Sequence, residues 1–87
     1  MFHVYILKSR NKKVLYIGNT NNLAKRLQAH NSGKNISTKP YIPWVLVYAE
    51  SYFSKEDAVN REQRLKQRGQ AVRRLKERIK NSFRNAC

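Results

Sequence analysis

Two segments near the beginning of the chain, both rich in β-branched and aromatic residues, limit the fold more than any other feature. They occupy residues 2–8 and 14–18, and only five polar residues separate them. This pattern predicts two antiparallel strands joined by a short hairpin turn. Because each strand has an apolar face that must be covered, the rest of the chain has to pack against this hairpin.

The remaining pattern predicts one further strand and three helices. Residues 44–48 form a near-continuous β-prone run that is expected to be the third strand. Thr20 or Asn21 can cap the first helix, and Ser54 gives a capping-box-like start to the second. The helices are expected over residues of about 21–31, 54–69 and 71–82. The order β-β-α-β-α-α predicts an α+β fold.

The length of the chain leaves room for one small domain. At 87 residues and 10.3 kDa it cannot be a large multi-domain enzyme. No internal repeat, low-complexity segment or Pro/Gly-rich linker divides the sequence. We therefore expect a single domain over residues 1–87, with a basic C-terminal helix at about 71–82.

The charge of the chain indicates a polyanionic partner. Nineteen Lys and Arg residues against five Asp and Glu residues give a formal net charge of +14. The charge is denser near the end, because residues 61–87 carry ten cationic and two acidic side chains. Such an imbalance repels itself, so nucleic acid is the expected partner.

Apolar runs are too short for a membrane span or a secretory signal. The longest covers residues 45–49, where a span needs about 20 residues. A soluble, cytoplasmic protein is expected. The single cysteine, Cys87, cannot form an internal disulfide or a cysteine-based metal site.

Four of the five acids have structural explanations. Glu56 and Asp57 lie in the expected first turn of the second helix, where negative charge is favourable. Glu77 has Arg73, Arg74 and Lys80 at helical spacing, which predicts exposed ion pairs. Glu50 is expected to mark the solvated end of the third strand.

Glu62 differs from the other acids because helical periodicity places it on the apolar side of the second helix, between Ala58 and Leu65. Burying a carboxylate costs several kcal/mol unless a partner compensates its charge. A structural arginine such as Arg26 and a bound metal ion are equally good candidates for that partner.

Two pairs of polar side chains are expected to lie near the hairpin. Any register that sets Tyr5 opposite residue 14, 16 or 18 puts the phenols of Tyr5 and Tyr16 on one face. Arg26 and His30 lie one turn apart on the first helix and can face the same cleft. An ordinary aromatic cross-strand pair and a structural histidine are the alternative interpretations.

Together these side chains provide one carboxylate, one guanidinium, one imidazole and two phenols in a strongly basic chain. This set suits phosphodiester cleavage with a single metal ion. Two-metal nucleases need several clustered carboxylates, which five acids with structural roles do not supply.

The same residues resemble the GIY-YIG endonuclease family, and specifically its small stand-alone bacterial members. The resemblance covers about residues 2–66 and is carried by Val4-Tyr5-Ile6-Leu7, Leu15-Tyr16-Ile17-Gly18, Arg26, His30, and Arg61-Glu62 with Leu65-Lys66. The first motif departs from the family name, since His3-Val4-Tyr5 stands where the name has Gly-Ile-Tyr. The missing glycine affects how closely a substrate backbone can approach the first strand.

The resemblance implies a three-stranded antiparallel sheet flanked by helices and one divalent cation, Mg²⁺ or Mn²⁺, held by Glu62. It also implies catalytic roles for Tyr5, Tyr16, Arg26 and His30. Asn81 is the counterpart of an asparagine that many members carry near the end of the domain.

These inferences predict a DNA endonuclease with a role in DNA repair or recombination. A non-catalytic nucleic-acid-binding module with a decayed nuclease site is the main alternative, and a ribosome-associated structural protein is another. Seven cationic residues are expected to bind nucleic acid: Lys39, Arg61, Lys66, Arg73, Arg74, Arg78 and Lys80. The preferred DNA structure and the oligomeric state stay open.

Overall fold

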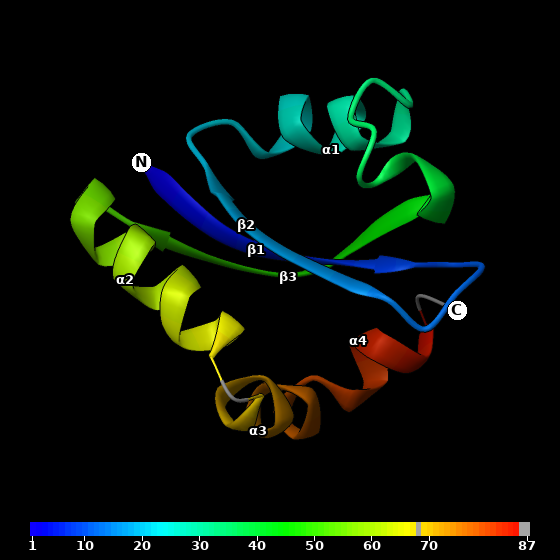
Figure 1. The fold of residues 1–87 in the computed structure, drawn as a ribbon. Helices are drawn as coiled ribbons and strands as arrows, with labels where there is room; N and C mark the ends of the chain where they lie inside the picture. Colours follow the sequence, from blue (N-terminus) through cyan, green and yellow to red (C-terminus); the bar gives the residue numbers. More distant parts are fainter. Residues whose placement is uncertain (68, 86–87) are drawn as a thin grey trace.

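The computed structural model describes residues 1–67 and 69–85. Cys87 lies outside the described residues. Figure 1 shows a small sheet with helices on both faces. In chain order the elements are β1 (Phe2–Ser9), β2 (Leu15–Thr20), α1 (Leu23–Asn31), a short 3₁₀ turn η1 (Lys39–Tyr41), β3 (Trp44–Tyr52), α2 (Lys55–Lys66), α3 (Gln70–Arg78) and α4 (Lys80–Asn85).

The sheet has three strands in the order β2-β1-β3, and both neighbouring pairs are antiparallel. The predicted α+β fold with a three-stranded antiparallel sheet is therefore confirmed. Tyr5 in β1 faces Gly18 of β2 on one side and Ala49 of β3 on the other. Since β1 is the central strand, it carries the most buried part of the chain, while β2 and β3 form the two edges of the sheet.

Each face of the sheet has its own apolar cluster. Val4 and Ile6 pack with Ala58 and Leu65 of α2 and with Leu75 of α3. The alternate residues of β1, Tyr5 and Leu7, point the other way and form a second cluster with Trp44 of β3, against which Leu23 and Leu27 of α1 pack. Figure 1 shows α1 above the sheet and α2, α3 and α4 below it. The period-two alternation of β1 thus gives the molecule two chemically distinct sides.

The helix caps and ends differ from the sequence predictions, and α2 ends at Lys66, three residues before the predicted end near residue 69. The cap of α1 is Asn22, not Thr20 or Asn21, and its side-chain oxygen accepts the backbone N–H of Lys25. Ser54 precedes α2 without making the side-chain cap bond that the capping-box pattern predicts. The helix predicted over 71–82 is two helices, because Ile79 leaves helical geometry while its side chain packs on the first apolar cluster.

Candidate active site

Tyr5 and Tyr16 lie on the same face of the sheet, as the hairpin pattern predicts. The register pairs Tyr5 with Gly18 and Leu7 with Tyr16, so the two phenols are diagonal neighbours. Their ring centroids are 6.1 Å apart and the ring planes differ by 28°. The Tyr5 hydroxyl lies directly over Gly18, since a Cβ atom there would come within 2.6 Å of it. The absence of a side chain at Gly18 makes room for this phenol.

Helix α1 carries Arg26 and His30 to the tyrosines. Leu23 and Leu27 pack the helix onto the second apolar cluster, which directs His30 inward, where it is only 1% exposed. Nε2 of His30 lies 3.2 Å from the Tyr5 hydroxyl, and its ring centroid lies 4.5 Å from that of Tyr16. Nε–H of Arg26 donates to the Tyr5 hydroxyl over 3.4 Å. The structure therefore brings these four predicted residues together.

Thr38 fixes the direction of the hydrogen bonds through His30. The hydroxyl of Thr38 donates to the backbone oxygen of Asn35, so it has no second hydrogen for the imidazole. In the His30 tautomer that matches this bond, Nδ1, 3.1 Å from that hydroxyl, carries the ring proton and donates it to Thr38. Nε2 is left as the acceptor, and the Tyr5 hydroxyl donates to it. The result is a directed chain from Arg26 through Tyr5 to His30.

The electrostatic surroundings keep both His30 and Tyr5 neutral. Burial, together with the charge of Arg26, lowers the pKa of His30 below its ordinary value of 6.5. Burial raises the pKa of Tyr5 above its ordinary value of 10.0, while the hydrogen bond from Arg26 opposes part of that rise. A neutral imidazole beside a neutral phenol can accept the phenolic proton, which is the arrangement a proton relay requires.

Glu62 reaches the edge of the sheet from the opposite face. Its carboxylate accepts a hydrogen bond from the side-chain amide of Asn19 in β2 and one from the ammonium group of Lys66. The Glu62 side chain is 15% exposed, in agreement with the predicted inward orientation. Arg26 is not its partner, because Arg26 is bound to Tyr5 on the other face of the sheet. Of the two partners predicted for Glu62, Arg26 is therefore wrong.

The donors around Glu62 fit a hard divalent cation. No group of three or more His, Cys, Asp or Glu side chains lies together within residues 1–67 and 69–85. Mg²⁺ does not need such a cage, since it is commonly held by one or two carboxylates, substrate phosphates and water. Glu62 supplies one carboxylate. The Asn19 side chain, whose N–H group donates to this carboxylate, also carries a carbonyl oxygen. Lys66 has to release Glu62 before a cation can bind there.

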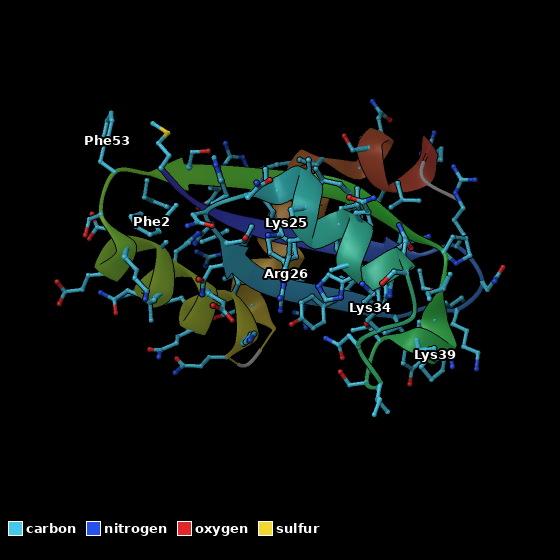
Figure 2. All side chains as sticks on the ribbon, turned by 90° about the horizontal axis from the view of Figure 1, so that it is seen from above. Phe2, Lys25, Arg26, Lys34, Lys39 and Phe53 are labelled. Atoms are coloured by element: carbon cyan, nitrogen blue, oxygen red, sulfur yellow. The ribbon has the colours of Figure 1, made fainter. Side chains whose placement is uncertain are left out.

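A row of cationic side chains follows α1 above the sheet. Figure 2 shows Lys25, Arg26, Lys34 and Lys39 in sequence along this side of the molecule. Two hollows of about 310 and 190 Å³ adjoin here and share Arg26 and Ala29 in their walls. His30 lines the larger of them. A phosphate backbone lying along this row would therefore pass next to the tyrosines.

The other cations predicted to bind nucleic acid do not lie along this row. Arg61 binds Glu50 through Nε and Nη2, at 2.9 Å for Nη2. Lys66 is paired with Glu62. The remaining predicted cations belong to α3 and α4, below the sheet: Arg73, Arg74, Arg78 and Lys80. Asn81 is also on α4, so it does not join the tyrosine cluster.

Two predictions about acids are wrong for the described residues. Glu77 forms none of the predicted ion pairs within the part of the chain that the structure describes. Glu50 is not a solvated strand end but accepts hydrogen bonds from Arg61, Tyr48 and Tyr52. Burial alone would raise the pKa of Glu50, but these three donors hold it below its ordinary value of 4.5. Burial, together with the hydrogen bond that its hydroxyl donates to Glu50, raises the pKa of Tyr52 to about 12.

Sequence reasoning missed Asn19, Thr38 and the cations Lys25 and Lys34. The alternation of β2 could have placed Asn19 on the α2 side of the sheet, next to an inward Glu62. Lys25 directly precedes Arg26 on the predicted first helix, so its place in the sequence could have indicated it as well. Thr38 gives no local signal, because its role depends on how the loop before β3 folds over α1.

Comparison with known proteins agrees with this geometry. Residues 1–82 match the GIY-YIG catalytic domain. The chain belongs to the GIY-YIG family. Members of this family are endonucleases, so a nuclease-type function follows for the GIY-YIG domain described here.

Curated relatives cover most of this GIY-YIG chain. A UPF0213 protein of Staphylococcus haemolyticus is 40% identical over 79 residues, which are 87% of this chain and 95% of the relative. A UPF0213 protein of Oceanobacillus iheyensis is 41% identical over 75% of this chain and 76% of its own length. One of Clostridium perfringens is 45% identical over 76% of this chain and 71% of its own length. No solved structure matches the chain.

In the described part of the GIY-YIG chain, no helix is both long and apolar enough to cross a membrane.

Proposed function

We propose that the protein is a DNA endonuclease that hydrolyses a phosphodiester bond with the help of one divalent metal ion, Mg²⁺ or Mn²⁺. The observation that carries this proposal is the directed chain Arg26–Tyr5–His30 beside the edge that Glu62 and Asn19 occupy. The family match supports the same reaction class. DNA is the expected substrate, and a role in its repair or recombination stays a prediction.

Tyr5 is the group that accepts the proton of the attacking water in this mechanism. Its hydroxyl first passes its own proton to Nε2 of His30, the acceptor that Thr38 leaves free. The resulting phenolate then takes a proton from water as the water oxygen bonds to phosphorus and the 3′ oxygen leaves. Because burial holds the pKa of Tyr5 above its ordinary value of 10.0, working near pH 7 requires that pKa to fall by more than about three units, or at least roughly 4 kcal/mol.

Arg26 supplies part of that stabilisation. Its Nε–H already donates to the Tyr5 hydroxyl, so it favours the phenolate over the phenol. The guanidinium also interacts with Tyr16, and it lines the adjoining hollows, where its planar fork can meet a phosphate. Tyr16, stacked beside Tyr5, is in position to orient the water. A metal ion bound by Glu62 would neutralise charge on the phosphate and on the leaving oxygen.

A specific observation supports the main alternative, a non-catalytic nucleic-acid-binding module. Lys66 neutralises Glu62, which is also what a purely structural carboxylate would need. Both functions predict DNA binding, so only an assay of DNA cleavage distinguishes them.

Incubation of supercoiled plasmid and of branched DNA with the purified protein tests the proposal. Cleavage in Mg²⁺ or Mn²⁺ that stops on addition of EDTA supports the nuclease. Tight binding of both substrates without any cleavage in either metal would leave the binding module as the function.

A further inference from the structure

A pocket of about 290 Å³ opens between α2 and α3, and its walls are rich in arginine. Leu75, which is almost fully buried, and Ala71 form its apolar part. The four cationic side chains that line it come in pairs from the two helices: Arg61 and Arg64 from α2, Arg74 and Arg78 from α3. Among residues 1–67 and 69–85, none of those that line this pocket is acidic.

Within the residues that the structure describes, one carboxylate, that of Glu50, pairs with these four guanidinium groups. Arg61 is held by Glu50 through Nε and Nη2, which fixes its position. In the described part of the chain, no carboxylate forms an ion pair with Arg64, Arg74 or Arg78. Cations gathered in this way repel one another, and an anion in the pocket would relieve that repulsion. Arginine forks match the geometry of phosphate better than lysine does.

The arginine pocket lies on the other side of the sheet from the tyrosines. Figure 1 shows α2 and α3 below the sheet, while α1 with Arg26 and His30 lies above it. Arg78 also acts electrostatically on Tyr48 of β3, whose side chain belongs to the lower apolar cluster. A straight duplex lying along α1 therefore cannot reach the arginine pocket at the same time.

We propose that the arginine pocket binds the backbone phosphates of a second nucleic-acid segment, so that one protein holds two segments on opposite sides of its sheet. This inference rests on the nucleic-acid substrate of the proposed function. It also bears on substrate choice, because two segments held together are a feature of branched or paired DNA.

Two variants with the same loss of charge separate the pocket from general basicity. The pocket variant is Arg64→Gln/Arg74→Gln/Arg78→Gln. The control variant is Lys55→Gln/Lys76→Gln/Arg84→Gln, which changes exposed residues of α2, α3 and α4 that do not line the pocket. Glutamine has nearly the same helix propensity as arginine and lysine, so both variants should fold, as thermal melts will check.

The assay measures capture of a second duplex. A 20-base-pair duplex is immobilised, the protein is added in EDTA, and a fluorescent duplex of different sequence follows. We expect the wild-type protein and the control variant to capture the second duplex to within about threefold of each other. The pocket variant should capture it at least about tenfold less, with affinity for the first duplex changed less than about threefold. Each lost phosphate contact should also lower the salt dependence of capture by about 0.9 log unit per decade.

Equal losses in the pocket and control variants would overturn the inference, as would a wild-type protein that binds one duplex but never captures a second. Failure of the proposed function gives a different result. Capture of two duplexes without metal-dependent cleavage would support the arginine pocket and contradict the nuclease proposal. Cleavage without capture would support the nuclease proposal and contradict the arginine pocket.

Discussion

The side-chain amide of Asn19 donates a hydrogen bond to Oε1 of Glu62 and so joins the edge strand β2 to helix α2. Asn19 directly follows Gly18, over which the Tyr5 hydroxyl lies. The carboxylate also acts electrostatically on Tyr5, since it contributes to the raised pKa of that phenol. The acid and the phenol come from opposite faces of the sheet, and they reach neighbouring residues of the edge strand β2, Asn19 and Gly18.

Asn19→Ala is expected to lower the affinity for the metal ion more than it lowers the stability of the fold. A group that orients a metal ligand typically changes metal affinity by about 10- to 100-fold. The Mg²⁺ concentration that gives half-maximal cleavage should rise by at least about tenfold. Asn60→Ala, on the exposed side of α2, is the control and should leave it unchanged. An unchanged Mg²⁺ dependence in Asn19→Ala would show that Asn19 does not orient the carboxylate.

Gly18→Ala is expected to displace Tyr5. The added Cβ would lie 2.6 Å from the Tyr5 hydroxyl and 2.8 Å from Cζ, so the phenol has to move. Overpacking of this kind costs about 1–3 kcal/mol of stability. In a Tyr5→Phe background the cost should be smaller, because the closest atom is gone. A double-mutant cycle of unfolding free energies measures this coupling, and strict additivity would contradict the contact.

Thr38→Val is expected to reduce kcat while leaving KM nearly unchanged. The valine keeps the shape of threonine but removes the acceptor that holds the proton on Nδ1 of His30. Leaving that buried N–H without a partner costs about 1–3 kcal/mol of stability. Thr38→Ser should restore both properties, and Ser37→Ala, at the neighbouring exposed position, should change neither. A kcat that stays low in Thr38→Ser would contradict the positioning role.

His30 should make the fold sensitive to mild acid. Its pKa is lowered in the folded state, so below about 6.5 the unfolded chain binds more protons and the free energy of unfolding falls as pH falls. Arg26, Tyr5 and Tyr16 face the imidazole, and only the arginine is charged in this range. Denaturation of the wild type at pH 7 and pH 5 should show this loss, and His30→Gln should reduce it. Glu50 titrates below this range, because its pKa is lowered from 4.5.

Local patterns in the sequence were sufficient to predict the tyrosine pair, the α1 residues and the inward Glu62. Tyr5 and Tyr16 follow from strand alternation, and Arg26 and His30 follow from helical spacing. These periodicities are properties of single elements, so they can be read without tertiary structure. The length of the C-terminal helix could not be predicted in the same way, because Ile79 interrupts it to reach the apolar cluster.

Partners brought together by tertiary contacts could not be predicted. Glu50 and Arg61 are eleven residues apart on different elements, and their pairing depends on how α2 packs beneath the sheet. Thr38 meets His30 only because the loop before β3 returns over α1. The pocket between α2 and α3 likewise depends on the angle at which two helices pack.

The most direct measurement of the central claim compares Glu62→Gln with Glu56→Gln in Mg²⁺-dependent cleavage. Glutamine at position 62 keeps an oxygen that can accept the hydrogen bond from Asn19, and losing the exposed pair with Lys66 costs at most about 1 kcal/mol. Glu56 is an exposed acid in the first turn of the same helix. We expect Glu62→Gln to lower the cleavage rate by at least about 100-fold and Glu56→Gln to change it less than about twofold. A folded Glu62→Gln protein that cuts DNA at the wild-type rate in Mg²⁺ would contradict the account.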